Sequence, residues 1–77
     1  MYEWVRDFSQ EGIYGGEWWK LSRPLFYAVV FNKRGDGWRW RIYSHADLES
    51  QGTYPSKQDA IINCEAAIAE MVNESIS

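Results

Sequence analysis

The sequence predicts an α+β domain in which a twisted antiparallel sheet of three to five strands packs on one C-terminal helix. Three features indicate this class. Apolar residues recur every second position in the middle of the chain, and they recur with a helical period after Ser56. Glycine-containing turns separate the predicted strands. The 77 residues are enough for one domain, residues 1–77, with one small core.

The N-terminal part of the chain alternates loosely. In "YEWVRDFS", residues 2–8 place aromatic and polar side chains in turn, which favours a strand. The following "QEGIYGGEWWKLS" contains three glycines. We therefore expect residues 13–14 and 17–21 to form short edge strands or an ordered loop.

A hairpin is predicted from "LFYAVVFNKRGDGWRWRIYS". Residues 25–31 are β-branched and aromatic, "NKRGDG" is a typical turn, and residues 38–43 alternate strictly. If the loop is symmetric, the cross-strand pairs on the core face are Phe31–Trp38, Val29–Trp40 and Tyr27–Ile42. The other face then carries Phe26, Ala28, Val30, Arg39, Arg41 and Tyr43, so that it is half apolar and half cationic.

A turn is expected at His45–Asp47, followed by a third strand over residues 49–54. Within that strand, Gly52 is a candidate for a bulge or for a close approach of another group.

The C-terminal segment predicts one helix over residues 57–74. Ser56 is a good N-cap residue, and Pro55 prevents an earlier start. The predicted apolar stripe consists of Ile61, Cys64, Ile68, Met71 and Val72, flanked by Ala60 and Ala67. Ile62 lies off this stripe. The stripe needs a sheet or another chain to cover it.

The meander and helix resemble the small YegP-like repeat of bacterial proteins of unknown function. The matching segments are residues 38–42 ("WRWRI"), residues 50–57 ("SQGTYPSK") and the alanine-rich residues 60–68. The resemblance implies a meander followed by a helix and supplies no site residues. Because related proteins often hold two such units in tandem, it also implies that two chains could pair as a homodimer.

Composition limits the chemistry that the chain can perform. Thirteen aromatic residues supply a large contact area for a short chain. The single Cys64 cannot form an internal disulfide, and the single His45 cannot build a usual zinc site. The N-terminus lacks the pattern of a signal peptide, so we expect a cytoplasmic protein. We expect no enzymatic activity, no cofactor and no membrane partner.

Charge is segregated along the chain. The net charge is −3, yet residues 20–41 hold six basic residues against Asp36 alone. A cationic centre between acidic ends is typical of a dipolar surface that can steer a partner.

Two functional hypotheses use the half-cationic face of the hairpin. The first is a small non-catalytic interaction module, a regulator or inhibitor that binds a protein partner or itself as a homodimer. The alternative is a single-stranded nucleic-acid binder, in which aromatic rings stack bases and arginines neutralise phosphates. The candidate binding residues are Arg39, Arg41, Tyr43, Phe26, Lys33 and Arg34.

A purely structural interpretation of this face also stays open. Trp4, Trp18 and Trp19 would fold over it as a second core, and Arg39 and Arg41 would pair with Glu3, Asp7 or Glu17.

Overall fold

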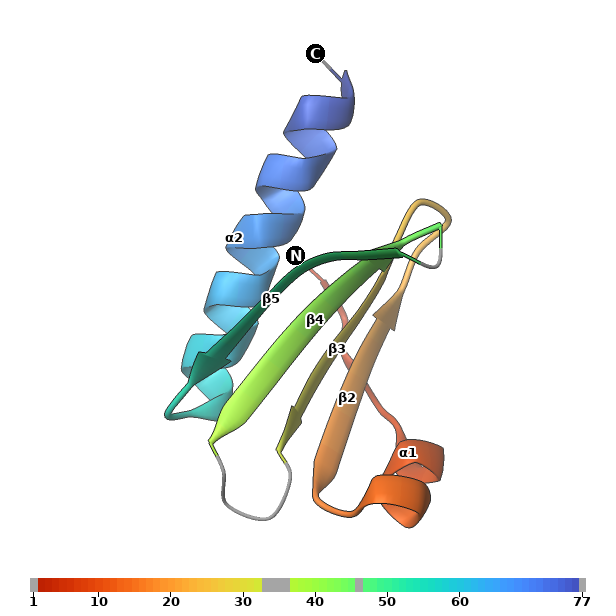
Figure 1. The fold of residues 1–77 in the computed structure, drawn as a ribbon, viewed down its shortest axis with the longest axis vertical. Helices are drawn as coiled ribbons and strands as arrows, with labels where there is room; N and C mark the ends of the chain where they lie inside the picture. Colours follow the sequence, from red (N-terminus) through yellow and green to blue (C-terminus); the bar gives the residue numbers. More distant parts are fainter. Residues whose placement is uncertain (1, 33–36, 46, 77) are drawn as a thin grey trace.

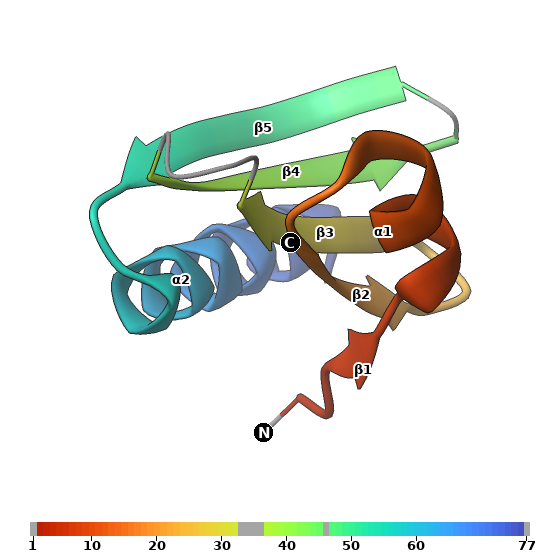
Figure 2. The same cartoon turned by 90° about the horizontal axis from the view of Figure 1, so that it is seen from below.

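The computed structural model describes residues 2–32, 37–45 and 47–76, and it confirms the predicted α+β class. The described elements are β1 (Val5–Arg6), α1 (Phe8–Tyr14), β2 (Glu17–Ser22), β3 (Tyr27–Asn32), β4 (Trp38–Ser44), β5 (Asp47–Tyr54) and α2 (Lys57–Ile76). The strands form one antiparallel sheet in sequence order, from β1 to β5. The long helix α2 runs along one face of the sheet, and α1 lies at the β2 end on the other face (Figures 1 and 2).

The pairing of β3 with β4 differs by one residue from the predicted register. Val30 opposes Trp40 and Ala28 opposes Ile42, whereas Val29 opposes Arg41. Because side chains alternate between the faces of a strand, this shift exchanges the two faces of β3. The predicted placement of Tyr27, Val29 and Phe31 against the helix is therefore wrong, whereas β4 presents the predicted residues to each face.

The main core lies between the sheet and α2, and we call it the helix-side core. Its buried members are Leu21, Phe26, Ala28, Val30, Trp40, Ile42, Ala60, Cys64 and Ile68. The predicted stripe of α2 supplies Cys64 and Ile68, and Ala60 flanks that stripe. Ile62 is 55% exposed, as its position off the stripe indicates. The Ser56 hydroxyl accepts the N–H of Asp59 at 3.2 Å, which confirms the predicted N-cap. Neither helix in the described residues has the length and apolar character needed to cross a membrane.

The N-terminal segment departs from the prediction because it forms a helix. Only two residues pair with β2 as a strand, and residues 13–14 belong to α1 and not to an edge strand. The Asp7 carboxylate caps α1 by accepting the N–H of Gln10 at 3.3 Å. Gly15 ends the helix with a φ of 76°, a conformation that glycine adopts without strain. Residues 17–21 do form a strand, within β2.

Strand β5 begins two residues earlier than predicted and is shaped by Gly52. Trp40 opposes Gly52, and a Cβ atom on Gly52 would lie 2.7 Å from the indole Nε1 of Trp40. Gly52 is thus a close-approach site, one of the two predicted roles. The bulge lies instead where the register shifts between Ile42 and Tyr43 of β4. Ile42 pairs with Ser50 and Tyr43 pairs with Leu48, so Glu49 of β5 has no paired residue on β4.

We expect Gly52→Ala to destabilise the fold by about 1 to 3 kcal/mol, because the new methyl group would displace the buried indole of Trp40. Urea unfolding followed by tryptophan fluorescence measures this loss. Gly12→Ala is the matched control, because a Cβ atom there meets nothing within 4 Å and alanine favours the helix. Equal stability of the two variants would show that Trp40 does not pack on Gly52.

Candidate binding face

The sheet face opposite α2 carries three of the six residues that the sequence marked for binding, namely Arg39, Arg41 and Tyr43. We call it the open face. Its paired positions on β2 to β5 are Trp18, Lys20, Ser22, Tyr27, Val29, Phe31, Arg39, Arg41, Tyr43, Leu48, Gln51 and Thr53. Rigid strands therefore position these side chains, and loops do not.

At the α1 end of the open face, aromatic rings form a stack. The Trp18 and Phe31 rings are parallel, with 4.1 Å between their centroids. Tyr14 of α1 lies against Trp18, with centroids 5.6 Å apart. The guanidinium carbon of Arg41 lies 5.3 Å from the centroid of the Phe31 ring, a cation–π contact. Trp18, Val29 and Phe31 are buried and form a second, smaller core.

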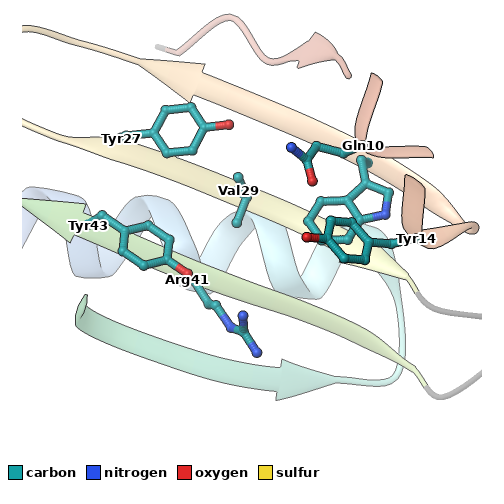
Figure 3. Close-up of a pocket in the computed structure, with 7 residues that line it drawn as sticks. Gln10, Tyr14, Tyr27, Val29, Arg41 and Tyr43 are labelled. Carbon is teal, nitrogen blue, oxygen red and sulfur yellow. The ribbon is translucent and has the colours of Figure 1, made fainter. Parts of the chain in front are cut away.

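Beyond the stack, Tyr27 and Tyr43 form a half-exposed aromatic pair. They oppose each other on β3 and β4, and their ring centroids are 6.5 Å apart. Figure 3 shows both rings lying side by side, with Val29 between them and Tyr14. Burial is the main factor that raises the pKa of Tyr27, so its hydroxyl stays protonated and can donate a hydrogen bond.

A groove of about 380 Å³ joins the stack to the tyrosine pair. Val29 lies in its floor, and Arg41 and Gln10 supply its nitrogen donors (Figure 3). A second groove of about 350 Å³ lies over β4 and β5, where Arg39 and Arg41 stand beside Gln51 and Thr53. We call it the arginine groove. Arg41 lines both.

The charged side chains at the paired positions of the open face are all cations, namely Lys20, Arg39 and Arg41. The ion pairs found between described residues are Arg6–Glu11 and Lys57–Glu17, and neither includes these two arginines. The predicted pairing of Arg39 and Arg41 with Glu3, Asp7 or Glu17 is therefore wrong for the described residues. Their guanidinium groups keep donors for a ligand.

Carboxylates are used elsewhere in the fold. Glu17 accepts the indole N–H of Trp19 at 2.6 Å, and this bond lowers the pKa of Glu17. Glu65 accepts the indole N–H of Trp4 at 3.0 Å. Both glutamates lie on the α2 side of the sheet, away from Arg39 and Arg41.

The structure brings Arg39, Arg41 and Tyr43 together and corrects the predicted place of Phe26. Phe26 is buried in the helix-side core, because the register places Tyr27 opposite Tyr43. Trp18 covers the open face as the structural interpretation predicted, whereas Trp4 and Trp19 pack on the helix-side core.

Some predicted features fall outside the described residues. They are Lys33, Arg34 and most of their turn, and Ala46 in the turn at His45–Asp47.

Sequence reasoning missed Tyr27, Tyr14 and Gln10 as residues of the site. Tyr27 needs the correct register of β3. Tyr14 and Gln10 reach the groove from α1, and the cap that could have revealed this helix is Asp7 before "FSQE".

The single cysteine offers no nucleophile. Cys64 is buried in the helix-side core, and burial raises the pKa of its thiol to about 12. A protonated thiol is a poor nucleophile. Among the described residues, no three His, Cys, Asp or Glu side chains gather as metal ligands do.

Comparisons with protein families, with curated proteins and with solved structures gave no match to this chain. The resemblance to the YegP-like repeat stays a prediction.

We expect Arg39→Gln and Arg41→Gln each to change the free energy of unfolding by less than about 1 kcal/mol, because neither guanidinium is ion-paired with a described residue. Arg6→Gln is the contrasting variant. It removes the partner of Glu11, which also accepts the backbone N–H of Trp18, so it should lower stability. Urea unfolding of the three variants checks this. A loss of several kcal/mol in Arg41→Gln would assign that side chain to the fold and remove it from the site.

Proposed function

We infer that the protein is a small non-catalytic interaction module that binds a partner protein through the open face. The observation that carries this function is the incomplete cover of that face. Helix α2 packs against β3, β4 and β5 on the opposite side, whereas the backbone of α1 lies against β2 among the described strands. Tyr27, Tyr43 and Arg41 are consequently half-buried, and Arg39 is exposed.

The residue types at this face are those that dominate binding energy at protein interfaces. Tyrosine, tryptophan and arginine are enriched at such hot spots because they combine large contact area with directed polar groups. Helix α1 adds further exposed apolar area, and its Tyr14 lines the groove. Phe8 is 70% exposed, Ile13 68% and Tyr14 54%. A partner protein can bury these side chains, and the phosphates of a nucleic acid give them no favourable contact.

Single-stranded nucleic acid is the second candidate. It is favoured by the Tyr27–Tyr43 pair, which offers ring surface for base stacking, and by the cations beside it. Salt-sensitive binding of an oligothymidylate that is lost in Arg41→Gln would support this candidate over a protein partner.

Site-specific photo-crosslinking tests the protein-binding function. Benzoylphenylalanine placed at Thr53, on the open face, should give adducts heavier than the 9.1 kDa chain in cells that express it. The same group placed at Ala66, an exposed position of α2, is the matched control and should give none. An adduct of twice the mass of the chain would identify self-association as the interaction. Crosslinks at Ala66 and none at Thr53 would contradict binding through the open face.

A further inference from the structure

The two arginines of the open face and Tyr43 form a row along one strand. Arg39, Arg41 and Tyr43 occupy alternate positions of β4, so they point to the same side of the sheet. Neighbours in this row are about 6.8 Å apart, because each residue of an antiparallel strand advances about 3.4 Å. A ligand that matches the row needs two anionic groups, one for each arginine, and an apolar group for Tyr43, all at this spacing.

An extended polypeptide has the same spacing between every second side chain. Laid over β4, a segment with acidic, spacer, acidic, spacer and apolar residues would place its two carboxylates at Arg39 and Arg41, and its apolar side chain over Tyr43. Guanidinium groups bind carboxylates in bidentate fashion, and Gln51 and Thr53 line the same groove as further polar groups. The apolar side chain would reach Tyr27 and Val29.

We propose that the open face binds an extended acidic segment of a partner protein in which two carboxylates two residues apart are followed, or preceded, by an apolar residue at the same spacing. This inference rests on the proposed function and names the chemistry of the partner. A second copy of the chain does not supply this pattern from its long helix, because side chains two residues apart on a helix do not share a face.

Three observations favour a peptide over a nucleic acid as the occupant. The row carries two cations in a chain of net charge −3, which gives a weak electrostatic footprint for a polyanion. The Trp18 and Phe31 rings already stack on each other and are buried, so they cannot stack on bases. Val29 lies in the groove beside the tyrosine pair, and its aliphatic side chain suits an apolar residue of a peptide and cannot stack on a base.

NMR titration of the ¹⁵N-labelled full chain tests the proposal with capped synthetic peptides. The probes are Gly-Glu-Ser-Glu-Ser-Phe-Gly and its reversed sequence, because either direction fits the row. The matched control is Gly-Glu-Glu-Ser-Ser-Phe-Gly, which has equal charge and composition but adjacent carboxylates that an extended chain points to opposite sides. We expect saturable shifts at Val29, Arg41 and Tyr43 with one of the spaced peptides, and at least threefold weaker binding of the control.

Variants separate specific contacts from general attraction. Arg39→Gln and Arg41→Gln should each weaken binding of the spaced peptide about threefold to tenfold. Lys57→Gln removes a positive charge on the α2 side and should leave the affinity unchanged.

Three results would overturn the proposal. The first is equal affinity for the spaced and control peptides. The second is chemical-shift changes at α2 in place of the open face. The third is tighter binding of an eight-nucleotide oligothymidylate than of either spaced peptide. If crosslinks form from Thr53 but the spaced peptides show no preference, the interaction module stands and the acidic-segment inference fails.

Discussion

The register between β3 and β4 determines what each face of the sheet carries. Val30 opposes Trp40 and both enter the helix-side core, which leaves Val29 beside Arg41 on the open face. A shift of one residue would move every side chain of β3 to the other side. It would place the Tyr27 ring and hydroxyl against α2 and would separate Tyr27 from Tyr43. The open face carries Tyr27, Val29 and Phe31 because Ala28 and Val30 are buried beneath α2 in this register.

The two helices cover the sheet unequally, and the face that is less covered carries Lys20, Arg39 and Arg41. Helix α2 spans β3 to β5 and buries its stripe, whereas the backbone of the short α1 lies against β2 among the described strands. The open face consequently stays accessible over β4 and β5. Because its arginines and tyrosines project from paired strands, a partner would lose little of its binding energy to ordering the backbone of the site. Glu17 and Glu65, held by indole N–H groups on the far side, do not compete for the arginines.

Local signals predicted the parts of the fold that local chemistry determines. Ser56 and Pro55 set the start of α2, and the helical period identified its buried stripe. Which residues of β3 face α2 could not be predicted in the same way. Strand β3 is apolar on both faces, so its sequence shows no alternation of apolar and polar residues that would identify the buried face. For β4 the alternation of tryptophan and arginine gave the faces correctly. The shared face of Arg39, Arg41 and Tyr43 was therefore predicted correctly, whereas Phe26 was placed on that face wrongly, because its position depends on the register with the partner strand.

The most direct test of the account is a methyl-resolved NOESY experiment on the folded chain. If the register is as described, the methyl groups of Ala28 and Val30 give cross-peaks to Ile68 of α2. The methyl groups of Val29 give cross-peaks to the Trp18 ring and none to α2. Cross-peaks between Val29 and Ile68 would contradict the account. They would place Tyr27 and Phe31 in the helix-side core, and the open face would lose these aromatic side chains.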